Sequence, residues 1–78
     1  MDSEKILGRV IELFSAMTEA EEITADSDLF DDLEVSSMDV LFLISSLEEE
    51  FSVKVPEKEL RRVSTVGDIA DILEHLLG

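Results

Sequence analysis

The sequence predicts an all-α protein: a small four-helix bundle with three long helices, one short helix and a long loop between the first and second. Apolar residues recur every three or four positions in three separate segments, which is typical of amphipathic helices. Only three Gly and one Pro occur among the 78 residues, so few positions interrupt a helix. A chain of this length forms one domain, which we expect to comprise residues 1–78.

The first helix is expected from about Ser3 to Thr18. Its apolar stripe, assigned to the core, contains Ile6, Val10, Leu13 and Met17, widened by Leu7, Ile11 and Phe14. The periodicity then fails from Glu19 to Ser36, where Asp, Ser and Thr accumulate. We predict a long structured loop here, pinned to the helices by four apolar anchors: Ile23, Leu29, Phe30 and Leu33.

The second helix is expected to begin at Ser36-Ser37-Met38-Asp39 and to run to about Phe51. A Ser followed three positions later by an acidic residue is a variant of the capping box. The face predicted to be buried contains Val40, Leu43, Ile44, Leu47 and Phe51. Another face carries Met38, Leu41, Ser45 and Glu48, with Phe42 and Glu49 beside them.

The last third of the chain predicts a short helix followed by a longer one. An extended segment, Val53-Lys54-Val55, precedes Pro56, which suits the first position of a helix reaching about Arg62. Thr65-Val66-Gly67-Asp68 offers another capping box for a final helix to Leu77. Its stripe contains Val66, Ile69, Ile72, Leu73 and Leu76, while His75 and Gly78 fit its C-terminal end.

The composition excludes several kinds of chemistry. With no Cys and one His, the chain has no disulfide, no thiolate metal site, no cysteine nucleophile and no evident imidazole-centred site. The first residues lack the basic and apolar regions of a secretory signal, and the longest apolar run is Val40 to Ile44. We therefore expect a cytoplasmic protein.

The charge is strongly acidic and unevenly distributed. The net charge is −14, and no Lys or Arg lies between Arg9 and Lys54, where 13 of the 20 Asp and Glu occur. Such a field repels nucleic acid and anionic membranes and attracts basic partners. A solvated face that only maintains solubility is the other interpretation. We expect a monomer that binds neither nucleic acid nor membrane.

Two motifs together resemble the signature of acyl carrier proteins. They are Asp32-Leu33-Glu34-Val35-Ser36-Ser37-Met38-Asp39 and Leu47-Glu48-Glu49-Glu50-Phe51. In that family an Asp-Ser-Leu core begins the second helix and a Leu-Glu-Glu-Glu-Phe run closes it. Shorter matches at Val55-Pro56-Glu57 and Ser64-Thr65-Val66 extend the resemblance over essentially the whole chain.

The resemblance implies a non-catalytic carrier that is modified at Ser37. The Ser37 hydroxyl would form a phosphodiester to 4′-phosphopantetheine, transferred from coenzyme A by a Mg²⁺-dependent phosphopantetheinyl transferase. The thiol of this cofactor would hold acyl groups as thioesters for enzymes of fatty acid, polyketide or lipid biosynthesis. Independently, a helix N-terminus favours a phosphate, and a chain without Cys needs an external thiol. Local sequence alone favours the interpretation that Ser36 and Ser37 are only N-cap residues, and the resemblance over the whole chain reverses this preference.

The resemblance also implies two sets of binding residues. The acidic contacts to Lys and Arg of partner enzymes map onto Asp39, Glu48, Glu49 and Glu57. An acyl chain would lie between helices against Leu47, Phe51, Val55, Leu60, Val63 and Ile69. Many carriers have a small residue at the position of Leu60, so this pocket is expected to be short.

Two residues depart from the family pattern near Ser37. Ser36 replaces the usual Asp, which removes one negative charge but preserves helix capping. Phe42 replaces a usual Glu and lies off the core stripe, so it should be at least partly exposed. With Met38 and Leu41 it would form an apolar patch suited to a partner contact. Together these changes predict a specialised carrier that is still loaded.

Three other interpretations compete with the carrier. Asp26-Ser27-Asp28 begins like a calcium-binding EF-hand loop, but Phe30 occupies a ligand position and Asp31 replaces the required Gly. An unmodified acidic protein-interaction module fits if Ser37 is never loaded. An enzyme is disfavoured because no nucleophile, base and orienting group can be assembled.

Overall fold

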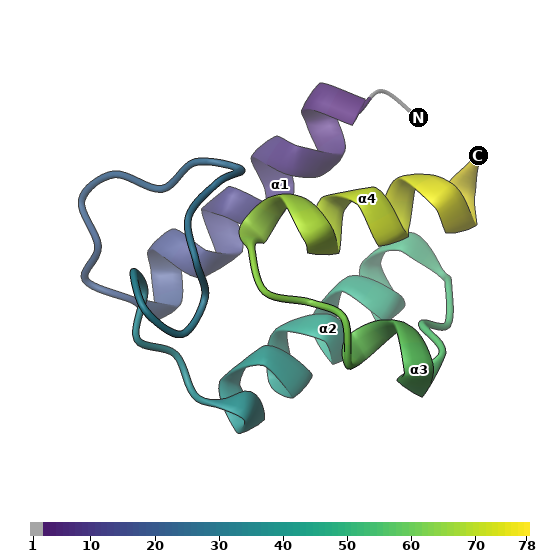
Figure 1. Ribbon diagram of the computed structural model, residues 1–78. Coiled ribbons are helices and arrows are strands. Elements are labelled where there is room, and N and C mark those ends of the chain that lie inside the picture. Colours follow the sequence, from purple (N-terminus) through teal and green to yellow (C-terminus); the bar gives the residue numbers. More distant parts are fainter. Residues whose placement is uncertain (1–2) are drawn as a thin grey trace.

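The computed structural model describes residues 3–78, and this part of the chain forms a bundle of four α-helices. The helix α1 packs chiefly against α4, with α2 across the bundle from α4 and the short α3 at one end (Figure 1). None of the helices in residues 3–78 combines the length and the apolar character needed to cross a membrane. The predicted fold is confirmed, and the bounds are α1 Ser3–Met17, α2 Ser37–Phe51, α3 Glu57–Leu60 and α4 Val66–Leu77.

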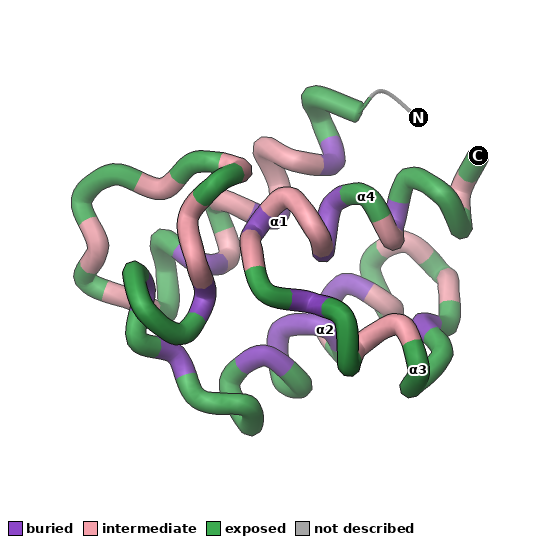
Figure 2. The backbone as a smooth tube through the Cα atoms, in the orientation of Figure 1, coloured by how far each residue is buried: buried purple, intermediate pink, exposed green. Residues whose placement is uncertain are grey.

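The core forms where the apolar stripes of α1, α2 and α4 meet, and each of these helices has several buried positions along it (Figure 2). Two residues predicted to belong to these stripes are instead partly exposed, Met17 at 37% and Leu76 at 36%. Each lies in the last turn of its helix. The largest fully buried side chains are Phe14, Ile6, Leu29, Leu43, Leu47, Ile69 and Leu73.

Both predicted capping boxes are present. At α2 the Ser36 hydroxyl accepts from the Asp39 N–H at 3.2 Å, and the Asp39 carboxylate accepts from the Ser36 N–H at 2.9 Å. At α4 the Thr65 hydroxyl and the Asp68 carboxylate make the same reciprocal pair, at 3.2 and 3.0 Å. These bonds satisfy N–H groups that have no partner within the helix, so the sequence defines where each helix begins.

The prediction of a third helix from Pro56 to Arg62 was wrong in its length and its first residue. Pro56 is the residue before the helix, with φ −61° and ψ 141°, and α3 contains only Glu57–Leu60. Its end tightens into a turn because the N–H of Arg62 donates to the Glu59 carbonyl three residues earlier, at 3.1 Å.

The long loop is fixed to the start of α4 by backbone hydrogen bonds. The Leu29 N–H donates to the Ser64 carbonyl at 2.9 Å, and the Gly67 N–H donates to the Ala25 carbonyl at 2.8 Å. The loop lies beside the N-terminal end of α4, far from it in sequence (Figure 1). The loop is therefore structured, as predicted, although it contains no helix.

One of the four predicted loop anchors was wrong. Leu29 and Leu33 are buried and Ile23 is half-buried, but Phe30 is 45% exposed. The Asp28 carboxylate accepts from the N–H groups of Phe30 and Asp31, each at 2.9 Å, in an Asx turn. The adjacent residues Leu29 and Phe30 in this turn therefore differ in burial, with Leu29 in the core and Phe30 partly at the surface.

Two helical glycines should respond in opposite directions to substitution by alanine. A Cβ at Gly67 would lie 2.9 Å from the Ala25 carbonyl oxygen, which is backbone, whereas nothing lies within 4 Å of a Cβ at Gly8. We expect Gly67→Ala to lower the free energy of unfolding by about 1–3 kcal/mol. Gly8→Ala should raise it by about 0.5–1 kcal/mol through helix propensity. Urea unfolding of both variants measures this, and equal stabilisation would contradict the tight contact at Gly67.

Candidate functional site

Ser37 is the first residue of α2, and its side chain is exposed. The cap of this helix is made by Ser36, whose backbone is extended (φ −88°, ψ 167°) and whose hydroxyl accepts from the Asp39 N–H. The Ser37 hydroxyl therefore takes no part in the cap. The two adjacent serines therefore differ: Ser36 closes the helix, as the capping-box pattern predicted, and Ser37 is available for chemistry.

A cleft of about 200 Å³ opens beside Ser37, between the long loop, α2 and the segment around α3. Its walls are mainly apolar, with one carboxylate and one guanidinium among the side chains. The residues that line it are Phe30, Ser37, Val40, Leu41, Glu57, Leu60, Arg61 and Val63.

Two of the six residues expected to contact an acyl chain line this cleft, Leu60 and Val63. The other four do not: Leu47, Val55 and Ile69 are buried in the core and Phe51 is half-buried. Sequence reasoning missed Phe30, Val40, Leu41 and Arg61 as cleft residues. A signal existed for Val40 and Leu41, which lie three and four residues after Ser37 and thus share its helix face.

The apolar patch near Ser37 is exposed, as expected for Phe42. Phe42 is 70% exposed, Met38 73% and Leu41 47%. Leu41 lines the cleft, while Phe42 lines a separate groove of about 170 Å³ between α1 and α2. The apolar patch of Met38, Leu41 and Phe42 therefore extends from the cleft, across the exposed face of α2, to this groove. The groove residues are Leu13, Ala16, Met17, Phe42, Leu43 and Ser46.

The four acidic residues expected to meet partner enzymes have different local roles. Hydrogen bonds from the Ser36 backbone N–H and then the Ser36 hydroxyl lower the pKa of Asp39. The Glu48 carboxylate accepts from the Val55 N–H at 2.7 Å and so holds the segment after α2. Glu49 and Glu57 are exposed. Asp39 and Glu48 therefore stabilise the fold in addition to contributing negative charge.

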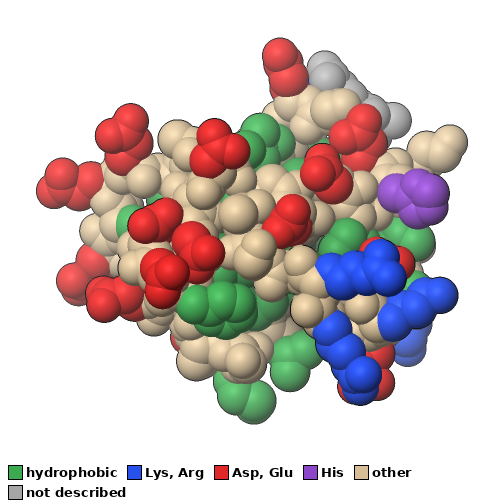
Figure 3. Space-filling model, in the orientation of Figure 1, with side chains coloured by type: hydrophobic (Ala, Val, Ile, Leu, Met, Phe, Trp, Pro, Cys, Tyr) green, Lys and Arg blue, Asp and Glu red, His purple; other side chains and the backbone are tan. Residues whose placement is uncertain are grey.

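The basic residues are concentrated at one place on the surface. In the visible face the Lys and Arg side chains gather over α3, whereas Asp and Glu spread over the rest (Figure 3). Four of the six Lys and Arg lie within residues 54–62. We call Lys54, Lys58, Arg61 and Arg62 the basic cluster. It borders the cleft, because Arg61 is one of the residues that line it.

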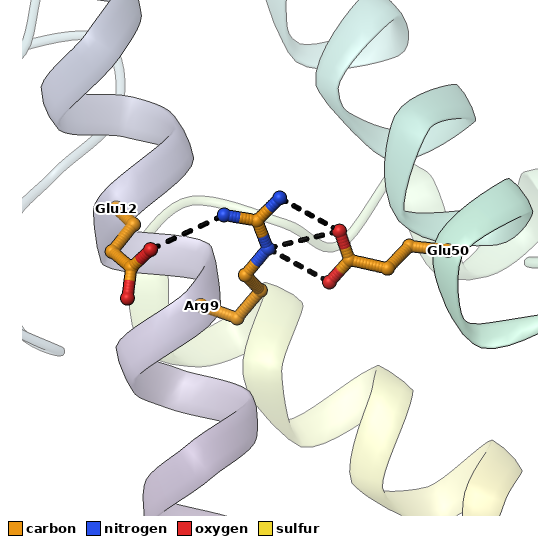
Figure 4. A network of polar contacts seen from close by, with 3 residues as sticks. All are labelled: Arg9, Glu12 and Glu50. Atoms are coloured by element: carbon orange, nitrogen blue, oxygen red, sulfur yellow. Dashed lines mark hydrogen bonds and ion pairs between the residues drawn. The ribbon is translucent and has the colours of Figure 1, made fainter.

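An ion-pair network joins α1 to α2 away from Ser37. The guanidinium of Arg9 contacts the Glu50 carboxylate with Nη2 to Oε1 at 2.8 Å, and its Nη1 lies 3.2 Å from Glu12 Oε2 (Figure 4). The hydrogen bond from Arg9 lowers the pKa of Glu50, against the smaller opposing effect of partial burial. Glu50 lies near the C-terminal end of α2, whereas Ser37 is its first residue. The network therefore links α1 to the end of α2 that is remote from Ser37.

The Asp68 capping box should contribute a pH-dependent part of the stability. Partial burial raises the pKa of Asp68, but hydrogen bonds from Ser64 and Thr65 together lower it below its ordinary value of 3.8. A lowered pKa stabilises the folded state above that ordinary value, and the stabilisation is lost as the pH falls through the lowered value. Asp68→Ala should therefore cost about 1 kcal/mol at pH 7 and progressively less below about pH 4.

The matched control is Asp71→Ala, which removes an exposed carboxylate from the same helix. It changes the net charge equally, so it corrects for general repulsion among the acidic residues. Urea unfolding from pH 7 to pH 3 measures both variants. The same pH dependence in both would show that the capping box is not responsible.

No group of three or more His, Asp or Glu side chains within residues 3–78 is arranged to hold a metal ion. The EF-hand-like segment begins at Asp26 and includes Asp28. The Asp28 carboxylate accepts hydrogen bonds from backbone N–H groups of its own turn.

Comparison with known proteins gives consistent matches over the length of the chain. Residues 4–73 match the family model described as phosphopantetheine attachment site. The acyl carrier protein of Thermotoga maritima is 38% identical over 77 residues, covering 96% of this chain and 95% of that protein. The acyl carrier protein of Borreliella burgdorferi is 35% identical over 80 residues and is covered completely, as is this chain.

A solved structure matches the arrangement of the helices. The acyl carrier protein from Enterococcus faecalis superposes with a TM-score of 0.83 at 26% identity, covering 97% of this chain and 99% of that one. The likeness extends to the whole bundle, including the long loop.

Proposed function

This chain belongs to the acyl carrier protein family, and from that premise we propose that Ser37 is the residue to which its 4′-phosphopantetheine is attached. The attached group supplies a thiol, absent from a chain without Cys, on which acyl groups are held as thioesters. The protein is thus an acyl carrier, and Ser37 is the residue that anchors its cofactor in this proposal.

The observation that supports Ser37 is its combination of exposure and freedom from capping. Ser36 makes the hydrogen bond that a helix start requires, so esterification of Ser37 leaves the cap intact. As the first residue of α2, Ser37 presents its Oγ beside N–H groups that have no partner within the helix and the positive end of the helix dipole. Both favour the negative charge of a phosphodiester there.

We propose that the cleft beside Ser37 takes the apolar part of the cargo. Its lining residues Val40, Leu60 and Val63 come from α2, from α3 and from the segment that follows it. Burial of methylene groups against such walls is favourable by about 0.8 kcal/mol each. With a volume of about 200 Å³ the cleft accommodates a short chain without rearrangement of the core.

The surface around Ser37 also defines the partners we propose. The exposed apolar patch of Met38, Leu41 and Phe42 lies beside Asp39, and Glu49 lies two turns after Phe42 on the same side of α2. A matching enzyme surface presents apolar side chains flanked by Lys or Arg. The acidic residues mainly accelerate encounter, while the apolar contacts decide which enzymes stay bound. The carrier itself contributes no catalytic residue.

Intact-mass spectrometry tests the proposed attachment. The chain is incubated with coenzyme A, Mg²⁺ and a broad-specificity phosphopantetheinyl transferase or the transferase of its own host. We expect a mass increase equal to one phosphopantetheine, with fragmentation locating it on Ser37. No increase with either transferase would overturn the assignment and would favour an unmodified interaction module.

A further inference from the structure

One cation lines the cleft beside the proposed attachment residue. Arg61 is the only Lys or Arg among the described residues that line it, and it follows directly after α3. Its guanidinium Nη2 lies 3.8 Å from Glu57 Oε1, and the two side chains are 79% and 84% exposed. Such a long, exposed contact contributes little, so the guanidinium is readily shared with another anion.

The sequence around Ser37 is acidic, whereas Arg61 on the cleft wall is positively charged. No Lys or Arg occurs between Arg9 and Lys54, so a phosphodiester on Ser37 adds one more negative charge to an acidic stretch. The surface on the far side of the cleft is different, because the basic cluster lies over α3 (Figure 3). An anion on Ser37 is therefore attracted across the cleft toward Arg61.

The helix geometry directs a substituent of Ser37 the same way. Ser37, Val40 and Leu41 share one face of α2, and all three line the cleft. Phe42 instead lines the groove between α1 and α2. A group attached to the Ser37 hydroxyl therefore emerges on the side of α2 that faces Arg61, not on the side of the groove.

We propose that Arg61 binds the phosphodiester on Ser37 and so directs the first part of the arm over the cleft between α2 and α3. The planar guanidinium can donate two parallel hydrogen bonds to two phosphate oxygens. Glu57 is the competing anion on the same cleft wall. Arg61 is thus a positioning residue for the cofactor, and this inference rests on the proposed attachment at Ser37.

Phosphorus NMR of the loaded protein tests the contact. Wild type, Arg61→Gln and Arg62→Gln are each loaded, and intact mass first establishes that each has received one phosphopantetheine. We expect the ³¹P resonance of Arg61→Gln to shift from the wild-type position and that of Arg62→Gln to stay there. Arg62 is the matched control because it is the adjacent exposed Arg and does not line the cleft.

Salt and two further variants separate a specific contact from a diffuse field. Raising NaCl should move the wild-type ³¹P resonance toward that of Arg61→Gln and should leave Arg61→Gln itself unchanged. Glu57→Gln removes the carboxylate that competes for Arg61. A higher NaCl concentration should therefore be needed to move its ³¹P resonance as far as that of wild type. Arg61→Lys retains the positive charge but cannot donate two parallel hydrogen bonds to the phosphate. Its ³¹P resonance should therefore lie between those of wild type and Arg61→Gln.

Two results would overturn the proposal. Coincident ³¹P resonances in all three loaded proteins would show that Arg61 does not contact the phosphodiester. Equal shifts in Arg61→Gln and Arg62→Gln would assign the effect to the basic cluster as a whole. A chain that never acquires the cofactor would instead refute the attachment at Ser37, and the mass measurement distinguishes that failure from these.

Discussion

Ser37→Ala is expected to abolish loading with phosphopantetheine completely, while Ser36→Ala is expected to remain fully loadable. The two serines are adjacent, but only Ser36 closes the helix, through its hydrogen bond with the Asp39 N–H at 3.2 Å. Removing the Ser37 hydroxyl removes the oxygen that forms the phosphodiester, and no neighbouring residue replaces it. Removing the Ser36 hydroxyl removes a cap and leaves the Ser37 oxygen in place.

The matched pair separates loss of chemistry from loss of structure. Ser36→Ala should lower the free energy of unfolding by about 1 kcal/mol, as is usual for an N-cap Ser. Ser37→Ala should leave that free energy nearly unchanged, because its side chain is exposed. Intact mass after incubation with transferase and coenzyme A, together with urea unfolding, measures both. A loaded Ser37→Ala variant would refute the assignment of the attachment residue.

Leu29→Ala should be among the most destabilising substitutions in the chain. Leu29 belongs to the long loop, yet its side chain is fully buried in the core. Its N–H donates to the Ser64 carbonyl at 2.9 Å, and its carbonyl accepts from the Val35 N–H at 3.0 Å. Truncation leaves a cavity in a well-packed site and should cost about 2–5 kcal/mol. That is a large share of the stability of a domain this small.

Phe30→Ala is the control for this prediction. It removes more atoms than Leu29→Ala, but from a side chain that is 45% exposed. We expect a smaller loss, within about 1 kcal/mol, because nearly half of the side chain is already exposed to water in the folded state. Urea unfolding midpoints of the two variants measure the difference. Similar losses at both positions would contradict the different burial of these neighbours.

The three long helices, and the first residues of α2 and α4, follow from short-range chemistry, which explains why the sequence predicted them. The capping boxes need only a Ser or Thr and an Asp three residues later, as at Ser36 and Thr65. The core faces need only apolar residues at helical spacing. The residue that ends α2 was harder to predict. The helix is capped at its C-terminal end by Ser52 in the left-handed conformation (φ 55°), a position where Gly is the usual residue.

The loop and the cleft required the tertiary structure. A loop has no period, so the sequence named Leu29 and Phe30 together as anchors, and only the turn at Asp28 separates the buried side chain from the exposed one. The cleft is built from segments distant in sequence, which brings Arg61 to the same cavity as Ser37. The sequence by itself therefore determined the helices, the family resemblance and the candidate serine, because these depend on local patterns. Only the packing of distant segments decided which loop side chain is buried, which apolar residues line the cleft and which cation lies beside Ser37.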